Sequence, residues 1–538
     1  MSEITSETTI VSPTDQELLV EFGATQGVDQ RPQKNITRLI PVVRRFAIVI
    51  FTLAFGSLMF NQILGPLVHD RAATALEQRL ASDLVNGVAP VSNPIAVGTP
   101  IGLVEVPNRD VRAVVVEGSK AEQLAQAGFK VMLLEEGAYY TRDDFVMQER
   151  WAYPNLYQEG AARKTRDQAI GILQGRTVGG STTVNWTTSI RTPKPTLDYW
   201  RQEFGLNFSD ETDLTPYFAK AEQRLNIHKW PVSPNANNAK LQQGCEALGW
   251  QYTVINRNVN GCANLGYCGM GCPINAKQSM LVSTIPAAMA LGAMLISRIS
   301  VRQLHWQGDS ITGLDAVPVD QHFQPRSDLR IRITAKHYIV AAGAIGSPAL
   351  LLRSKVPNPS GRLGRHTYLH PTVISGALFD ENVNGHSGAP QSIYSDQFVW
   401  PEASDKAGFK LEVPPLHPVL MATKLTGTGE QHAALMQQFN QLQVTIALLR
   451  DGFHPHSQGG TVQLDDAGQP VLDYPISDYL WQGMREALLA MAELQFAAGA
   501  KQVLPIHHDA KLYNSWPEAE AAIQQLSMEK LRQTVVSA

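Results

Sequence analysis

Residues Gly175–Trp186 read GRTVGGSTTVNW, and this stretch is the strongest indication of the fold. It sets Gly179 and Gly180 directly before three hydroxyl residues at 181–183. Glycines let a backbone approach a flat or anionic ligand closely, and neighbouring hydroxyls add hydrogen-bond donors. A tight structural turn has the same composition. On its own, the stretch therefore predicts either a cofactor-binding loop or a turn.

Two further stretches match the first in character. Phe129–Gly137 (FKVMLLEEG) predicts an apolar strand that carries Glu135 at its end, where an acid in a dinucleotide-binding unit accepts a hydrogen bond from a ribose hydroxyl. His337–Ser354 (HYIVAAGAIGSPALLLRS) predicts a strand, a turn of small residues and a helix, with Ser347 as the N-cap and Pro348 in the first turn. Small residues at such a junction allow a ligand to approach, although packing alone also explains them.

In this order and spacing, the three stretches resemble the glucose–methanol–choline (GMC) oxidoreductase family. The resemblance covers about residues 127–538 and extends to Gly261–Pro286, Gly361–Pro371 and Leu448–Leu464. It implies an FAD-dependent enzyme, similar to choline and alcohol dehydrogenases, that oxidises the CH–OH group of a small-molecule alcohol. A histidine serves as the general base in that chemistry. The electron acceptor is left open.

The resemblance also assigns cofactor contacts to particular residues. It implies that Glu135 holds the adenosine ribose and that Val301 lies against the adenine. The other implied FAD contacts are Val178, Gly179, Gly180 and Ser181 along the pyrophosphate and isoalloxazine, Asn185 and Trp186 near the flavin ring, and Ala342, Gly343 and Ala344 beneath the cofactor.

Two family segments have no match in this sequence. Where the family has G-x-G-x-x-G, residues Val114–Val131 read VVVEGSKAEQLAQAGFKV, and only Gly118 remains of that pattern. The chain ends at Thr534–Ala538, where the family's catalytic histidine segment would begin, so no catalytic residue is assigned. An inactive, membrane-anchored fusion or remnant is therefore the alternative to an impaired enzyme. The remaining candidate histidines are expected to pack or to lie on the surface: His370, His454 and His456 in family stretches, and His507 and His508 on a surface turn.

An uncharged apolar run, Phe46–Val68, follows five basic residues between 31 and 45. It is long enough to cross a bilayer, and the basic flank predicts a single-pass membrane protein with its N-terminus in the cytoplasm. A buried core helix and a cleaved signal peptide are the alternatives. The side on which the flavoprotein body lies is left open, because the basic flank predicts export whereas FAD is normally loaded in the cytoplasm.

Residues from about 30 to 125 resemble the N-terminal part of a membrane-anchored sortase. Within them, Ile101–Gly118 predicts two strands joined by a turn. A sortase needs a nucleophilic cysteine, and none precedes Cys245. Transpeptidase chemistry is therefore the least favoured function.

Charge and cysteine content exclude further classes. The 538 residues carry 45 Lys and Arg against 49 Asp and Glu, a net charge of −4, which argues against nucleic-acid binding. Four cysteines are too few for a disulfide scaffold. Three of them, Cys262, Cys268 and Cys272, cluster without a fourth ligand at metal spacing, so we expect no metal, and a disulfide among them is left open.

We therefore predict an α/β fold, an incomplete FAD-binding Rossmann-like domain, joined to an α+β substrate domain. The substrate domain is expected to contain a long amphipathic helix from Tyr479 to Ala498, ended by Gly499. The predicted order is a disordered basic tail (1–45), a transmembrane helix (46–68), a sortase-like stem (69–126), an FAD-binding domain (127–193 and 257–365) and a substrate-binding domain (194–256 and 366–538).

Overall fold

The computed structural model describes most of the chain from residue 100 onward. The described residues are 100–106, 111–116, 121–126, 128–205, 211–326, 329–401, 405–455 and 457–537. The predicted tail, the predicted membrane helix Phe46–Val68 and most of the predicted stem lie outside them, as does His456. None of the described helices combines the length and the apolar character needed to cross a bilayer.

The largest sheet in the described part of the chain has eight strands. Its pairs are antiparallel except for β19 and β4. The central strand β12 (Thr372–Leu378) is buried throughout, because its alternate residues enter two apolar clusters: Val373 and Ala377 one, Ile374 and Leu378 the other. In order, the strands are β4 (Ile170–Ile172), β19 (Val535–Ser537), β12, β15 (Leu442–Leu449), β14 (Phe409–Glu412), β13 (Ile393–Phe398) and β6 (Thr253–Val254), and β18 (Gln502–Pro505) also pairs with β12.

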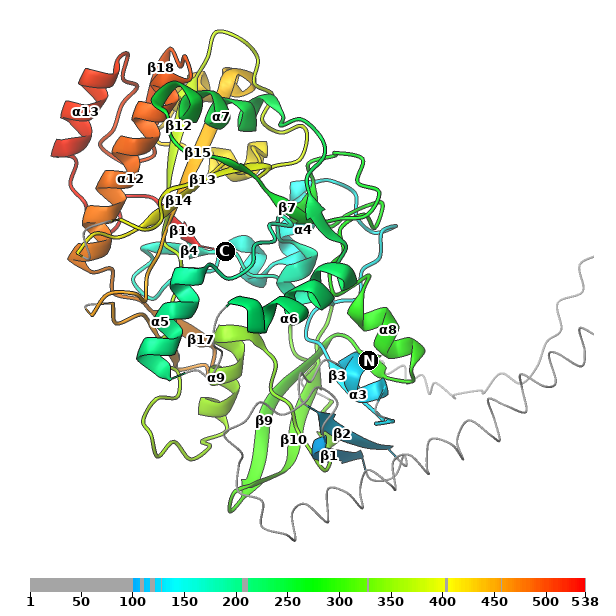
Figure 1. The fold of residues 1–538 in the computed structure, drawn as a ribbon. Helices are drawn as coiled ribbons and strands as arrows, with labels where there is room; N and C mark the ends of the chain where they lie inside the picture. Colours follow the sequence, from blue (N-terminus) through cyan, green and yellow to red (C-terminus); the bar gives the residue numbers. More distant parts are fainter. Residues whose placement is uncertain are drawn as a thin grey trace, which may run out of the picture. The chain divides into compact units, whose positions relative to one another are not determined.

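Helix α12 (Asp478–Ala497) packs on this sheet, beside α7 (Ala236–Leu248) and α13 (Trp516–Gln525) (Figure 1). The predicted helix is confirmed to within one residue at each end. The hydroxyl of Ser477 caps it by accepting a hydrogen bond from Leu480 N. Its predicted core residues Leu480, Met484, Leu488 and Met491 are all buried.

The second region contains smaller sheets. A three-stranded antiparallel sheet joins β9 (Ile299–Gln307), β10 (Ser310–Pro318) and β11 (Ile331–Ile333), and α9 (Gly343–Arg353) packs on β9 (Figure 1). A parallel pair joins β3 (Met132–Leu134) to β8 (Met294–Ile296). The predicted strands in Ile101–Gly118 are also present, as the antiparallel pair β1 (Pro100–Val106) and β2 (Val111–Val116). The mixed α/β class is confirmed.

The prediction for His337–Ser354 was partly wrong. No strand is assigned at 337–341, because no neighbouring described strand pairs with this segment. Helix α9 begins at Gly343, with Ala342 rather than Ser347 as its N-cap, so Pro348 lies inside it. The Ser347 hydroxyl instead accepts a hydrogen bond from Ala342 N at 2.9 Å. This bond ties Ala342 to the first turns of α9, so the helix begins before Ser347.

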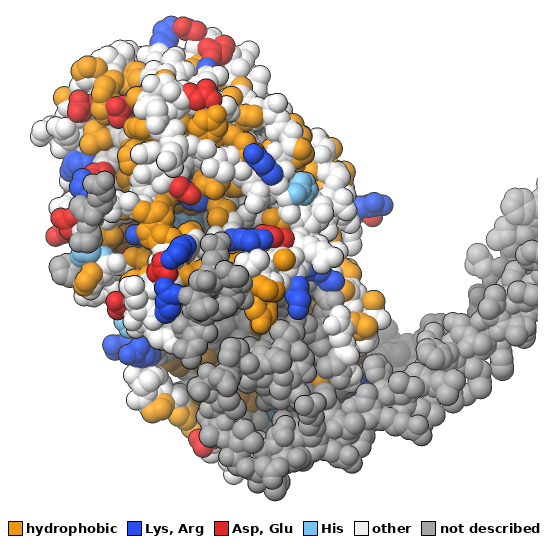
Figure 2. Space-filling view, in the orientation of Figure 1, with side chains coloured by type: hydrophobic (Ala, Val, Ile, Leu, Met, Phe, Trp, Pro, Cys, Tyr) orange, Lys and Arg blue, Asp and Glu red, His pale blue; other side chains and the backbone are white. Residues whose placement is uncertain are grey.

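Residues 194–256 are largely helical, as predicted. On the face shown in Figure 2, basic and acidic side chains are interspersed with hydrophobic ones. The remaining helices and strands are α3 (Ala121–Gln126), α4 (Glu149–Leu156), α5 (Lys194–Phe204), α6 (Glu211–Arg224), α8 (Thr284–Ala290), α10 (Pro418–Ala422), α11 (Glu430–Gln437), β5 (Ile227–Lys229), β7 (Asn256–Asn258), β16 (Thr461–Leu464) and β17 (Pro470–Asp473). Short 3-10 helices are η2 (Gln158–Ala161), η3 (Gly180–Thr183), η4 (Cys268–Met270) and η5 (Phe439–Gln441).

Candidate functional site

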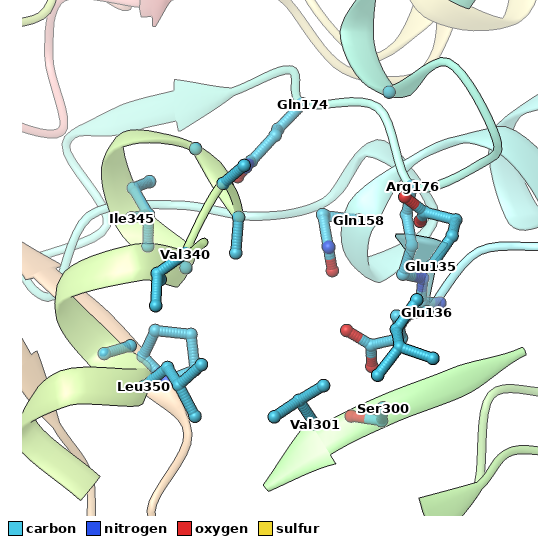
Figure 3. Close-up of a pocket in the computed structure, with 18 of the residues that line it drawn as sticks. Glu135, Glu136, Gln158, Gln174, Arg176, Ser300, Val301, Val340, Ile345 and Leu350 are labelled. Atoms are coloured by element: carbon cyan, nitrogen blue, oxygen red, sulfur yellow. The ribbon is translucent and has the colours of Figure 1, made fainter. Parts of the chain in front are cut away.

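A pocket of about 1480 Å³ lies where the end of β3, the loop before η3, the start of β9 and the start of α9 meet. Its two ends differ in chemistry (Figure 3). Glu135, Glu136 and Arg176 lie at one end, and Val340 and Leu350 lie at the other. The pocket can therefore receive a ligand that is polar at one end and flat or apolar at the other.

Glu135 stands directly after β3, where the strand directs it into the pocket (Figure 3). Its Oε1 accepts a hydrogen bond from Gly137 N at 2.7 Å. Burial raises the pKa of Glu135 to about 7, and the Gly137 N–H and the charge of Arg176 oppose this rise while Glu136 adds to it. The carboxyl group can thus either accept or donate a hydrogen bond near neutral pH.

The two loop glycines have different roles. Gly179 has φ 89°, and a Cβ there would lie 2.5 Å from Thr183 Oγ1, so the turn itself requires a glycine. Gly180 has φ 55°, and a Cβ there would meet no atom within 4 Å, although this residue lines the pocket. Ser181 Oγ accepts a hydrogen bond from Gly175 N at 3.0 Å, which closes the loop. Gly179 therefore shapes the turn, and Gly180 lines the pocket with open space beside it, while cofactor binding by this loop stays a prediction.

The start of α9 forms the opposite wall. Ala342 and Gly343 line the pocket at the helix N-terminus. The Ala342 N–H is already bonded to Ser347 Oγ, whereas the N–H groups of the first helical turn have no backbone partner within the helix and favour an anion. A Cβ at Gly343 would lie 3.6 Å from Gln174 Nε2. Val301, in β9, also lines the pocket.

The structure thus brings most of the predicted cofactor residues together, although their roles as FAD contacts stay predictions. Asn185, Trp186 and Ala344 do not line this pocket: Asn185 is exposed, and the Trp186 ring lies against Gly269. Those that do line it are Glu135, Val178, Gly179, Gly180, Ser181, Val301, Ala342 and Gly343.

Sequence reasoning missed the pocket's arginines. Arg163 Nε lies 2.8 Å from Glu159 Oε1, and its Nη1 donates to Gln174 Oε1 at 2.7 Å. The Arg176 guanidinium lies 3.6 Å from the centre of the Phe323 ring, and burial lowers its pKa. Arg302 and Arg353 line the pocket as well. These residues are spread from position 163 to position 353 with no local pattern, so only the fold brings them together.

The cysteines do not favour transpeptidase chemistry. Cys245 is fully buried in α7, and burial raises its pKa to about 11, so the nucleophilic thiolate is disfavoured. Cys262, Cys268 and Cys272 are free and partly exposed. Within the described residues, no group of three or more His, Cys, Asp or Glu side chains is arranged to hold a metal ion.

The structure corrects the predicted position of His507 and shows a buried histidine, His417, that was not predicted. His507 is buried rather than on a surface turn, because its Nε2 is paired with Ser527 O at 2.9 Å. His454 stacks on Tyr479, as the expectation of a packing role implies. His417, which the sequence did not single out, is buried and stacks on the Tyr267 ring.

Residues 153–372 match the family model described as GMC oxidoreductase. An uncharacterized GMC-type oxidoreductase of Mycobacterium tuberculosis is 31% identical over 415 residues, which are 76% of this chain and 63% of that protein. A long-chain-alcohol oxidase of Arabidopsis thaliana is 26% identical over 411 residues, 74% of this chain and 54% of that protein. A formate oxidase structure from Aspergillus oryzae superposes with a TM-score of 0.50 at 13% identity, covering 73% of this chain and 82% of that one.

The described part of the chain has a mixed α/β fold similar to that of the formate oxidase structure. Residues 153–372 are similar to the GMC oxidoreductase family. The family implies FAD as the cofactor. The chain spans 63% of the length of the Mycobacterium protein. Three features of the pocket are compatible with FAD: the open space at Gly180, the helix N-terminus at Gly343 and the Glu135 carboxyl.

Proposed function

We propose that the chain holds FAD in this pocket and oxidises an alcohol to an aldehyde or ketone. The observation that carries the proposal is the cavity of about 1480 Å³ at which Glu135, Gly180 and the start of α9 converge. FAD held there would supply the acceptor for the hydride of the alcohol carbon, while the hydroxyl proton would pass to a general base. The family match over residues 153–372 supports the same assignment.

In this proposal, each wall of the pocket has a separate task. Glu135 would bind the ribose hydroxyls, because Gly137 N engages only one of its two carboxylate oxygens. The backbone at Gly180 and the N–H groups at the start of α9 would bind the diphosphate. Arg163 and Arg176 would offset the negative charge of Glu136 beside it. No residue is assigned as the general base.

The similarity to long-chain-alcohol oxidases makes a long-chain primary alcohol the first substrate to test. We further propose that the protein is a single-pass membrane protein with a cytoplasmic N-terminus, on the evidence of Phe46–Val68 and its basic flank. An apolar alcohol partitions into such a membrane, which is consistent with both proposals.

The second candidate is a membrane-anchored protein without cofactor. The adjacent carboxyl groups of Glu135 and Glu136 favour it, because both face a pocket in which a diphosphate would be repelled by ionised acids. The two candidates differ in one measurable property, which is the bound flavin.

The test is to incubate the purified full chain with FAD, remove the free cofactor and quantify the flavin released on denaturation. Near-stoichiometric flavin is expected from the enzyme proposal. A folded chain that retains none would exclude it and leave the second candidate.

A matched pair of variants locates the site. Gly180→Leu and Gly308→Leu each place a side chain at a similar positive φ, 55° and 58°, with open space around it, but only Gly180 lines the pocket. We expect flavin retention to fall at least tenfold in Gly180→Leu and to stay unchanged in Gly308→Leu. Equal retention in the two variants would mean that FAD binds elsewhere.

A further inference from the structure

Lys277 is a buried lysine whose ammonium group bonds only to backbone. The residue is 3% exposed. Nζ donates to Thr183 O at 2.5 Å, to Asn185 O at 2.9 Å and to Cys268 O at 2.8 Å. An ammonium has three donors, so each of them is used.

The three carbonyls come from two segments of chain. Thr183 and Asn185 directly follow the glycine turn that lines the pocket, and Cys268 begins η4. These segments also pack tightly on each other, because a Cβ at Gly269 would lie 2.2 Å from Trp186 Cη2. Lys277 therefore connects the glycine turn to η4 from inside the protein.

No carboxylate is among the ionisable groups whose charge influences Lys277 in the described structure. The ionisable groups that do so in the described structure are Cys268, Cys272 and Arg257, and Arg257 is itself fully buried. Burial lowers the pKa of Lys277 to about 8, and the two thiols oppose this shift. A buried cation without an acid is costly, and backbone dipoles offset the cost only while all three bonds are made.

An apolar side chain of similar length would fill this space without that cost. A neutral amine would also fail to satisfy the three carbonyls, because it has only two N–H donors and its lone pair faces the third oxygen. The need to fill space therefore does not explain why this residue is a lysine. The three carbonyl oxygens that converge here from two segments do explain it, because together they require three N–H donors.

We propose that Lys277 is a positioning residue: its ammonium holds the backbone of Thr183–Asn185 against η4 and so keeps the glycine turn in the shape that lines the pocket. This inference rests on the proposed function only where it takes FAD as the ligand of the pocket. The three hydrogen bonds of Lys277 join two segments of the chain whether or not FAD binds.

The first test needs no flavin. Backbone amide hydrogen exchange is measured on the full chain for unmodified protein, Lys277→Met and Lys424→Met. Lys424 is the control, because it is a half-buried lysine whose pKa is likewise lowered by burial, but it bonds to neither segment. We expect exchange in 179–186 and 266–272 to become at least tenfold faster in Lys277→Met alone. Unchanged exchange in both segments would overturn the proposal.

The second test uses pH and the unmodified chain, so it does not depend on whether the variant folds. Because the pKa of Lys277 is lowered on folding, the unfolded chain binds more protons between about pH 8 and 10.5. The contribution of this lysine to stability therefore rises with pH in that window. A positioning role predicts that the FAD affinity of the unmodified chain falls over the same window by about tenfold, because the ammonium loses the proton that its third hydrogen bond needs.

The outcomes separate the two proposals. Faster exchange in Lys277→Met with no flavin bound by any form would retain the positioning role and exclude FAD. Flavin bound equally by unmodified protein and Lys277→Met at every pH, with equal exchange, would overturn the positioning role and leave the proposed function standing.

Discussion

The eight-stranded sheet and the pocket region both contain buried apolar residues, but they differ in whether those residues form a closed core. In the sheet, seven consecutive residues of β12 are buried, and α12 covers the strands with its own apolar face. In the pocket region, β3 and β8 have three residues each and border a cavity of about 1480 Å³. The sheet completes its own core, whereas the pocket region leaves apolar surface such as Ile339, which is 45% exposed, for a ligand to cover. Stability should therefore depend on a ligand only in the second region.

The largest expected effect is in the sheet region. Leu488→Ala removes a fully buried side chain of α12 and should lower the free energy of unfolding by about 2–5 kcal/mol, because a cavity remains. Ile339→Ala, at the wall of the pocket, should cost about 2 kcal/mol or less without FAD, because Ile339 is already 45% exposed. Urea denaturation of the full chain measures both. Equal costs would remove the distinction between the two regions.

Two buried glutamates give the next effect. Burial raises the pKa of both Glu135, in the pocket, and Glu412, in β14, to about 7. A carboxyl whose pKa is raised by folding contributes stability below its unfolded value near 4.5 and loses it as pH rises through about 7. Each group should therefore lower the free energy of unfolding over this range, by about 3 kcal/mol at most.

Glu135→Gln and Glu412→Gln should each remove part of that pH dependence, as followed by denaturation between about pH 4.5 and 8. Saturating FAD should alter the pH dependence due to Glu135 and leave that due to Glu412 unchanged, since only Glu135 lines the pocket. If FAD changes the titration of both residues equally, the ligand acts on the whole fold rather than on the pocket.

The smallest effect is on thiol reactivity. Cys245 lies in the sheet region with no exposed surface, whereas Cys262, Cys268 and Cys272 are partly exposed. Iodoacetamide should label the three clustered thiols in the native chain and leave Cys245 unmodified until unfolding. Mass spectrometry of the native and unfolded chains checks this. Native labelling of Cys245 at the rate of the other three would show that α7 opens readily.

Local patterns were sufficient for several elements. Helix α12 follows from its spacing of Leu480, Met484 and Leu488 and from the stop at Gly499. The pair β1 and β2 follows from two apolar runs separated by a turn. The place of the glycine turn and Glu135 in the pocket wall agrees with residue types that allow a ligand to approach closely. In each case, the residues that carry the pattern are near neighbours in the sequence.

Contacts between distant residues were decided only by the tertiary structure. The strand predicted at 337–341 is absent, because a strand needs a neighbour and the sequence does not supply the pairing. The arginines of the pocket and the stacking of His417 on Tyr267 likewise join distant segments. Lys277 bonds to a carbonyl 94 residues away, and no periodicity predicts that bond.

By itself, the sequence determined which segments could form, because that property depends on near neighbours. The tertiary structure decided which segments meet to form the pocket and which charged side chains are buried, because those properties depend on how distant segments pack.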